Sequence, residues 1–306
     1  MSLYLGIDGG GTKTTCAVGD ETYVFAVASA GGANVVRLGE ELARAGLHEA
    51  IARACTLAEI SPLRVAGVCV GAAGAAHAEV NAIIKQMVRR VLPNAEVRVV
   101  GDMVIAHEAA LEGQPGVVAI AGTGSIAYGR NAKGETGRAG GWGFRISDEG
   151  SGQWIGKTAV AESMRAFDAG HETWLLYSVL DRWKLNSRDD LVRFVNGNPA
   201  PNFSELFPDV QFAAEEGDRL AQEILARAGA ELAPLALTVL RRLFNPGEPV
   251  LVGVAGGIFA NSPEVRRAFQ ESLHSSWPAA EISLEVTEPV IGALRIARQL
   301  ATVRSA

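Results

Sequence analysis

The sequence predicts an α/β protein made of two related halves, and three observations support this fold class. A block of short β-like runs is followed by alternating helical and strand patterns. An apolar strand that enters a glycine-rich turn occurs near the start of the chain and again from Val117. The 306 residues also exceed the size of one typical domain.

The first half opens with three β-like runs, Leu3–Asp8, Thr14–Gly19 and Tyr23–Ser29. The turns between them are rich in glycine or acidic residues, which is typical of antiparallel hairpins. The alanine, leucine and glutamate content of Arg37–Leu57 favours a helix, and the strand Val65–Val70 follows. The pattern thus changes from β-hairpins to alternating β and α.

An amphipathic helix comes next. Apolar residues recur at spacings of three and four between Val80 and Val91, so one face of this helix is expected to cover a sheet. The strand Glu96–Val100 and a short helix to about Glu112 complete the first half.

The turn Gly113–Gly116 predicts a domain junction. We therefore expect a first domain of residues 1–116 and a second of residues 117–306. In the second, strand Val117–Ala121 enters another glycine-rich turn, as the opening strand does. Two similar halves that face each other would leave a cleft between them.

The rest of the second half reads as a mainly helical insertion, from about Ser151 to Leu243. The last strand that the pattern predicts is Val250–Ala255, which enters Gly256-Gly257. A closing helix is expected from about Val290 to Leu300, after a proline.

Charge, cysteine usage and hydropathy limit the function classes. The formal charge of −6 gives no broad cationic surface for nucleic acid or an anionic membrane. Three widely spaced cysteines, Cys16, Cys55 and Cys69, suggest neither a disulfide framework nor a zinc cluster. With no signal peptide or membrane span in the pattern, a reduced, cytoplasmic protein is expected.

The strongest local motif is the first glycine-rich turn, where strand Leu3–Asp8 ends in a carboxylate. Glycines let backbone N–H groups approach phosphate oxygens, hydroxyls add donors, and a lysine adds positive charge. Asp8 is suited to hold Mg²⁺ through water. A tight hairpin with Asp8 exposed at its mouth explains the same residues, and the motif alone leaves both interpretations open. The candidate phosphate-binding residues are Gly10, Gly11, Thr12, Lys13 and Thr14.

Two further glycine turns extend this pattern. Gly122, Thr123 and Gly124 offer the same donor types, and Gly256 and Gly257 would let backbone approach a flat ring such as adenosine. Each has a plain structural alternative, a β-turn for the first and a strand-to-helix turn for the second. Each turn alone is a weak indication of nucleotide binding, and the order of the three turns along the chain makes the indication specific.

In that order the motifs resemble the BadF/BadG/BcrA/BcrD ATPase family, in particular its N-acetylglucosamine kinase branch, over nearly the whole chain. The segments that carry the resemblance are Leu5–Thr14, Val65–Gly74, Val117–Ser125, Gly140–Gly143, Ser147–Ser151, Trp154–Gly156, Val250–Gly257 and Gly292-Ala293. The resemblance implies two ribonuclease-H-like (actin-like ATPase) domains facing a central cleft. It also implies ATP and Mg²⁺ as cofactors and an amino sugar as substrate.

The resemblance also implies site residues. Asp102 matches the catalytic aspartate that accepts the proton of the sugar hydroxyl, and Asn34 matches a residue that hydrogen-bonds the sugar. Trp142 and Asp148 match the sugar pocket, which Thr123 and Gly141 complete. From the residues alone, Asn34, Asp102 and Asp148 could equally be helix caps, and Trp142 a core anchor.

The implied reaction is phosphorylation of N-acetylglucosamine at its 6-hydroxyl. Glucosamine, N-acetylmuramic acid, N-acetylmannosamine and glucose present similar hydroxyls, and a non-catalytic sugar or nucleotide sensor on the same fold is the alternative from another class. No closely spaced cysteine pair exists for the iron–sulfur cluster of the family's dehydratase activators. Family analogy also implies a homodimer through the helical part of the second half.

Overall fold

The computed structural model describes residues 2–171 and 173–302. It divides into two compact units, one of Met1–Gln114 with Thr287–Ala306 and one of Pro115–Val286. The first unit is therefore built from two separate stretches of chain. Each unit contains one five-stranded sheet.

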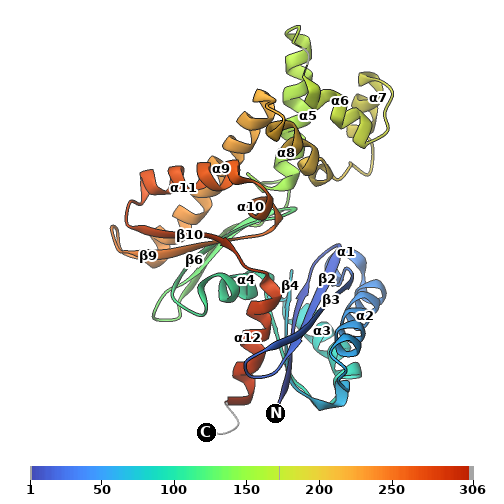
Figure 1. Cartoon of the computed structure of the whole chain (residues 1–306), viewed down its shortest axis with the longest axis vertical. Helices are drawn as coiled ribbons and strands as arrows, with labels where there is room; N and C mark the ends of the chain where they lie inside the picture. The colour runs from blue at the N-terminus through green and yellow to red at the C-terminus, as the bar shows by residue number, and fades with distance from the viewer. Residues whose placement is uncertain (1, 172, 303–306) are drawn as a thin grey trace. The chain divides into compact units, whose positions relative to one another are not determined.

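The sheet of the first unit has the strand order β3-β2-β1-β4-β5 (Figure 1). The first three strands form an antiparallel meander, and β4 and β5 continue the sheet in parallel with β1. Their bounds are β1 Leu3–Gly9, β2 Lys13–Gly19, β3 Val24–Gly31, β4 Val65–Ala72 and β5 Glu96–Val100. The carboxyl ends of the three parallel strands consequently meet at one edge of the sheet.

Helices cover both faces of this sheet. Leu47 and Ile51 of α2 and Met87 and Val88 of α3 join the apolar core on one face. Helix α12 and helix α4 cover the other face (Figure 1). The bounds of the helical segments are α1 Val35–Leu38, α2 Glu40–Leu57, η1 Pro62–Arg64, α3 Ala78–Val91, α4 Asp102–Leu111 and α12 Pro289–Thr302.

The helix predicted from Arg37 to Leu57 is two helices. Gly39, with a φ of +78°, separates α1 from α2. A φ of this sign is strained for residues with a Cβ atom but free for glycine. The break makes α1 a separate single turn, which contacts α2 and α3.

The closing helix α12 belongs to the first unit, whereas the predicted division assigned residues 117–306 to the second. Two glycines explain its position. A Cβ atom on Gly6 of β1 would collide with the backbone of Leu294, and one on Gly292 would collide with the backbone of Ile105 in α4. The absence of both side chains lets α12 pack directly against the backbone of β1 and α4.

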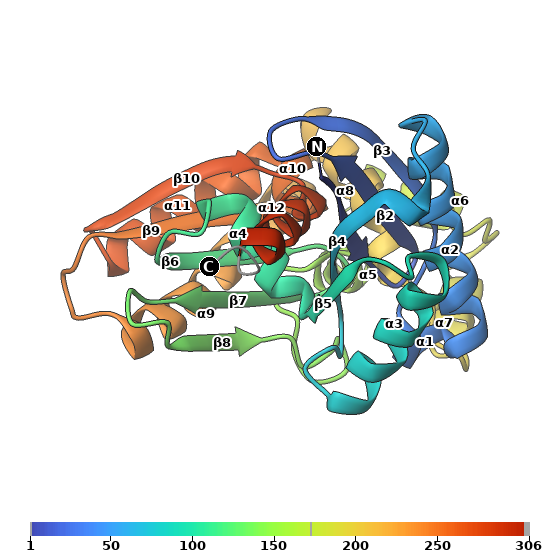
Figure 2. The same cartoon turned by 90° about the horizontal axis from the view of Figure 1, so that it is seen from below.

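The second unit repeats the topology of the first. Its sheet has the order β10-β9-β6-β7-β8, with an antiparallel meander β6-β7-β8 and two strands parallel to β6 (Figure 2). The bounds are β6 Gly116–Ala121, β7 Ser125–Arg130, β8 Thr136–Gly140, β9 Val250–Ala255 and β10 Ala280–Val286. The predicted repeat of one supersecondary unit is confirmed.

The helices of the second unit form two groups. Helices α9 and α11 contact each other, and α9 lies along β6, β7 and β8 over the main apolar core of the unit. Helices α5 to α7, with the segment η2, enclose a smaller core around Val179 and Leu206. The bounds are α5 Gly152–Asp168, α6 Trp174–Arg182, α7 Arg188–Val195, η2 Phe203–Leu206, α8 Phe207–Glu215, α9 Arg219–Leu243, α10 Gly257–Asn261 and α11 Pro263–Ser276.

Strand β10 was not predicted, because Val250–Ala255 was taken as the last strand. In Ala280–Val286 the odd-numbered Glu281, Ser283 and Glu285 are exposed, and the intervening residues are more covered. The strand forms one end of its sheet. Alternation of polar and apolar residues is typical of an edge strand with one face exposed to solvent.

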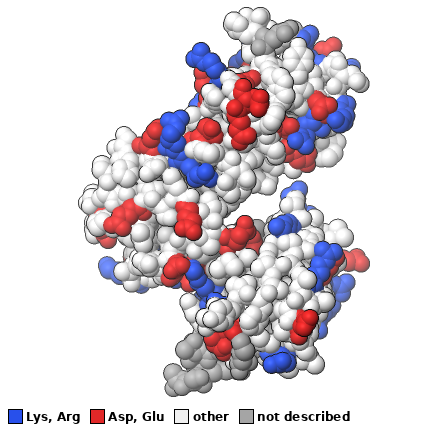
Figure 3. All heavy atoms as spheres, in the orientation of Figure 1, with Lys and Arg blue, Asp and Glu red and all other residues white. Residues whose placement is uncertain are grey.

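Among the described residues, no helix is long and apolar enough to cross a membrane. On the face drawn in Figure 3, acidic and basic side chains of the described residues are interspersed.

Candidate functional site

The first glycine turn connects β1 to β2. The Gly10 N–H donates to the Lys13 carbonyl at 3.0 Å, which closes the turn, and the Ala33 N–H donates to the Gly10 carbonyl at 3.0 Å. The side chains of Thr12 and Lys13 are exposed. These two backbone hydrogen bonds fix the turn, while the side chains of Thr12 and Lys13 remain accessible to a ligand.

Thr14 differs from its neighbours in the turn. Its side chain is fully buried in β2, and its hydroxyl has no hydrogen-bond partner among the described residues. The structure therefore does not present the Thr14 side chain to a phosphate, unlike those of Thr12 and Lys13. The alternation of side chains along β2 is the physical reason, since Thr14 points to the opposite face of the strand from the exposed Lys13.

Asp8 and Asp102 lie near each other at the edge of the first sheet. Asp8 pairs with Gly71, and Gly71 pairs with Val100, two residues before Asp102. Two strand spacings are about 10 Å, so the two carboxylates share one end of the sheet. Burial first, then the charges of Asp102 and Glu288, raise the pKa of Asp8 to about 6, and Lys13 opposes that rise.

Asp102 is the first residue of α4, whose N-cap is Gly101. The helix-cap alternative for Asp102 is therefore wrong. Its Oδ1 accepts the N–H of Met103 at 3.0 Å, and the side chain is exposed. Desolvation raises the pKa of Asp102 above its ordinary value, and the Met103 N–H works against this rise. Within residues 2–171 and 173–302, the outer oxygen, Oδ2, makes no hydrogen bond or ion pair that would prevent it from accepting a proton.

Asn34 is a helix cap, as the structural alternative proposed. Its Oδ1 accepts the N–H of Arg37 at 3.0 Å and begins α1. The amide nitrogen Nδ2 makes no hydrogen bond among the described residues. Asn34 can thus cap a helix and still donate to a hydroxyl, so the two interpretations are compatible.

The second glycine turn, in the second unit, is held by Asp148. Asp148 is buried, and its Oδ1 accepts the Ser125 N–H at 3.3 Å. A Cβ atom on Gly124 would lie 2.8 Å from Asp148 Oδ2, so a side chain there would displace this carboxylate. Helix α5 is capped by Ser151 instead, which accepts the Trp154 N–H. The cap alternative for Asp148 is therefore wrong.

Burial raises the pKa of Asp148, and the Ser125 N–H lowers it. Asp148 has a φ of +78°, an uncommon conformation for a residue with a Cβ atom. The surrounding loop fixes this conformation through the Ser151 N–H, which donates to the Asp148 carbonyl at 3.1 Å.

The second and third glycine turns lie together. Strands β6 and β9 are parallel neighbours, with Ile120 paired to Ala255, so Gly122 and Gly256 follow at the same edge. A Cβ atom on Gly256, whose φ is +96°, would collide with the carbonyl of Ala121. Gly257 begins α10 and is exposed. The structure brings these two predicted turns together, as binding of one nucleotide requires.

Trp142 is 59% exposed, so it is not a core anchor. The guanidinium carbon of Arg138 lies 4.5 Å from the centre of its ring. Gly141, with a φ of +72°, donates its N–H to the Ser125 carbonyl at 2.8 Å. The tryptophan turn is therefore attached to the second glycine turn. Thr123, on that same turn, is exposed.

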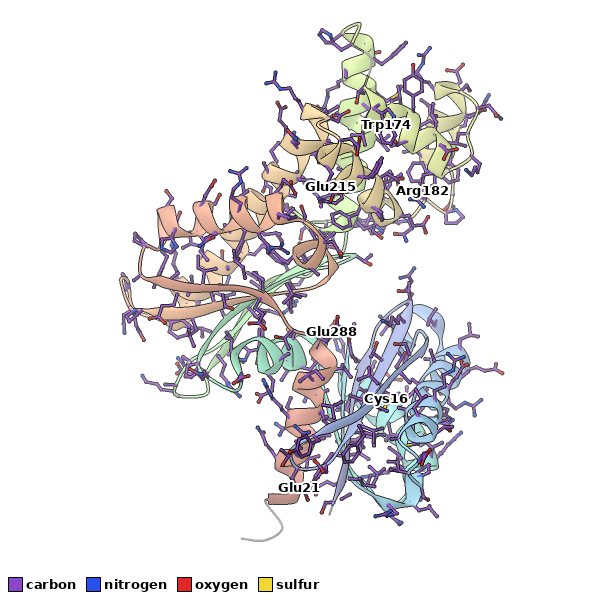
Figure 4. The ribbon with its side chains drawn as sticks, viewed as in Figure 1. Cys16, Glu21, Trp174, Arg182, Glu215 and Glu288 are labelled. Atoms are coloured by element: carbon purple, nitrogen blue, oxygen red, sulfur yellow. The ribbon has the colours of Figure 1, made fainter. Side chains whose placement is uncertain are left out.

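The predicted residues fall into two sets, one in each unit. The first unit contains Asp8, the first glycine turn, Asn34 and Asp102, and the second contains the other two turns with Trp142 and Asp148. Sequence reasoning missed Glu288, which begins the segment leading into α12 and acts electrostatically on Asp8 (Figure 4). Its position next to Pro289 at a helix start was the available signal.

A magnesium ion fits the first set only together with phosphate ligands. Among the described residues, no three His, Cys, Asp or Glu side chains are arranged to hold a metal ion. Mg²⁺ usually keeps several waters and takes one or two carboxylates plus substrate phosphates. The crowding of carboxylates that raises the Asp8 pKa is the charge environment that a cation would relieve.

Comparison with known proteins identifies the family. The model of the BadF/BadG/BcrA/BcrD ATPase family matches residues 5–297. The chain belongs to this ATPase family. The match spans both units and all three glycine turns, and it confirms the resemblance that the motifs indicated.

Named relatives of this ATPase family member cover nearly the whole chain. An N-acetylmuramic acid/N-acetylglucosamine kinase of Clostridium acetobutylicum is 33% identical over 97% of this chain and 99% of its own length. An N-acetyl-D-glucosamine kinase of Dictyostelium discoideum is 28% identical over 96% and 97% of the two chains.

A solved structure of a ROK family glucokinase from Streptomyces griseus superimposes with a TM-score of 0.64. It covers 97% of this chain and 100% of its own at 18% identity. At that identity the likeness shows the fold alone, and it confirms the predicted two-part α/β class.

Proposed function

We propose that this protein is an ATP-dependent kinase that phosphorylates the 6-hydroxyl of an amino sugar, with N-acetylglucosamine as its first candidate substrate. The observation that carries the proposal is the shared location of Asp8, Asp102 and the first glycine turn at one edge of a sheet. The kinase names of the relatives with full-length similarity support it.

The proposed roles follow from chemistry. Asp102 accepts the proton of the attacking hydroxyl, for which a raised pKa and a free oxygen suit a general base. Backbone N–H groups of the first and second glycine turns stabilise the negative charge of the transferring phosphoryl group. Gly256 and Gly257 leave space for the adenosine.

The proposed metal is Mg²⁺, which neutralises phosphate charge when it is bound, and Asp8 would hold it through water. The sugar would receive hydrogen bonds from Asn34 Nδ2 and contact the exposed face of Trp142. Asp148 would contribute mainly by fixing the turn Gly124-Ser125, with Thr123 and Gly141 beside it.

The test is ADP release, measured by a coupled assay with N-acetylglucosamine, glucosamine, N-acetylmuramic acid, N-acetylmannosamine and glucose. Asp102→Asn should lower kcat by about 10²–10⁴-fold, because general-base catalysis contributes that much. Sugar affinity should change little, since the asparagine keeps the shape and the contact with the Met103 N–H.

Glu112→Gln is a suitable control, because this carboxylate ends α4 at the opposite end from Asp102. Near wild-type turnover by Asp102→Asn would refute its assignment as the base. Sugar binding without any ADP production by the wild-type protein would refute the kinase and indicate a sensing protein instead.

A further inference from the structure

The side chain of Arg37 lies against the first glycine turn. A Cβ atom on Gly11 would be 3.1 Å from Arg37 Nη1 and 3.4 Å from Arg37 Cδ. These distances place the guanidinium directly over the residue at the tip of the turn. Neither the motif analysis nor the family resemblance assigned any role to this residue.

The backbone of Arg37 is fixed by residues of the candidate site. Asn34 Oδ1 accepts the Arg37 N–H, and Leu38 N–H donates to the Asn34 carbonyl, so Arg37 occupies the single turn that Asn34 caps. The Ala33 N–H binds the Gly10 carbonyl at 3.0 Å, which attaches the start of this segment to the glycine turn. The geometry of Arg37 relative to Gly11 is thus set by hydrogen bonds at both ends.

No acidic side chain among the described residues forms an ion pair with Arg37. Among residues 2–171 and 173–302, its guanidinium makes no ion pair or hydrogen bond with another side chain, and it is exposed. Lys13 is the cation that acts on Asp8. Arginine can present parallel N–H donors to two oxygens of one phosphate, which a lysine cannot do.

We propose that Arg37 binds the terminal phosphate of ATP and stabilises its charge during transfer. The proposal rests on the proposed function, in which the first glycine turn binds the phosphates. Arg37 lies three residues, about one helical turn, after the proposed sugar-binding Asn34 and also contacts Gly11. It therefore lies beside both the phosphate turn and the proposed sugar-binding residue.

Nucleotide affinity provides the first test. Calorimetry would compare a non-hydrolysable ATP analogue with ADP, each with Mg²⁺, on wild-type protein, Arg37→Ala and Arg37→Lys. Arg37→Ala should weaken binding of the ATP analogue by about tenfold or more and leave ADP within about twofold, because a charge-assisted hydrogen bond to the terminal phosphate is lost. Arg37→Lys should recover part of the difference.

Arg64→Ala is the matched control, because Arg64 is an exposed arginine of the same unit in the segment η1. It should bind both nucleotides as the wild type does. Equal weakening of both nucleotides by Arg37→Ala, or no change in either, would overturn the proposal. Equal melting temperatures of the two alanine variants would show that the comparison is not affected by unfolding.

Turnover provides the second test. Arg37→Ala should lower kcat by about 10²-fold with the KM for N-acetylglucosamine nearly unchanged, as expected for a lost donor to the transferring group. A rise in KM confined to N-acetylmuramic acid, which carries a carboxylate, would overturn the phosphate assignment and place Arg37 in sugar recognition. If the wild-type protein phosphorylates no sugar, the proposed function fails, and the difference between the two nucleotides still tests Arg37.

Discussion

At the scale of single residues, the site combines groups whose structural and chemical roles coincide. Asn34 caps α1 with its oxygen and keeps its amide nitrogen free, while Asp148 holds a glycine turn with its carboxylate. Among the carboxyl groups of the first set, Asp8 has the most strongly raised pKa, because it is partly buried and carries the additional effect of the Asp102 and Glu288 charges. Carboxyl groups with raised pKa values, such as Asp8 and Asp102, are more frequent at functional sites than elsewhere.

A pH prediction follows for Asp8. Its pKa rises from 3.8 to about 6 on folding, so the folded state binds the proton more tightly than the unfolded state. The stabilising contribution of the protonated group is complete below about pH 4 and is lost as the pH rises through 6. In the absence of metal and nucleotide, Asp8→Asn should therefore raise the free energy of unfolding at pH 8 by on the order of 1–3 kcal/mol.

The same substitution should have little effect near pH 4, where the aspartate is already neutral. Urea titrations at the two pH values measure the difference, and Glu79→Gln, at an exposed carboxylate of α3, is the control. A destabilised Asp8→Asn protein at pH 8 would contradict the assigned cause of the pKa shift.

At the scale of elements, sequence periodicity predicted most strands and helices but failed where tertiary contacts decide. The strand Glu96–Val100 and the long amphipathic helix were predicted closely, since their patterns are local. Strand β10 was missed because polar and apolar residues alternate along it, without the continuous apolar run of Val250–Ala255. The helix from Arg37 was predicted as continuous because a single glycine, Gly39, breaks it through its φ angle, which composition does not reveal.

The candidate site was predictable to a similar degree. The glycine turns are visible as strand-end motifs, and family resemblance added Asp102, Asn34, Trp142 and Asp148. Arg37 could not be predicted, because its importance depends on a contact with a segment that is separate in the sequence. The helix start next to Pro289 marked Glu288 only as a helix-terminal residue, and its charge effect on Asp8 depends on the fold.

Packing of α12 leads to a prediction at this scale. Gly292→Ala should destabilise the first unit by about 1–3 kcal/mol or more, because the added methyl group meets the backbone of Ile105 and Ala109 instead of flexible side chains. The helix propensity of alanine would work in the opposite direction by about 1 kcal/mol. Chemical denaturation measures the net effect.

Gln299→Ala serves as the control in the same helix, since this side chain is exposed. Unchanged or increased stability of Gly292→Ala would show that α12 can move away from α4 without loss, contrary to the close packing described here.

At the scale of the whole molecule, two copies of one topology carry different sets of the predicted site residues. Both sheets have three antiparallel strands followed by two parallel ones, and both place a glycine turn after the first strand. The first unit adds carboxylates at its strand ends, and the second adds the tryptophan turn and a large helical insertion. The repeated topology was predictable from sequence, but the return of the last helix to the first unit was not.

Because α12 belongs to the first unit, removal of the C-terminal segment should affect the two units differently. A chain that ends at Val286 lacks α12, which supplies Val290, Ala293, Leu294, Ile296 and Ala297 to the core on one face of the first sheet. Its first unit should be unstable and rapidly cleaved by protease, while Pro115–Val286 keeps its own core and resists cleavage. Mass spectrometry of the protected fragments measures the outcome, and equal protection of both units would contradict it.

The first unit consists of two separate chain segments, which also affects its folding during synthesis on the ribosome. Gly6 of β1 is synthesised early, but α12, which packs against it, is synthesised last. Translation of the intervening Pro115–Val286 takes on the order of ten seconds or more. The second unit can therefore fold before the first is complete, while one face of the N-terminal sheet has α4 available but still lacks α12.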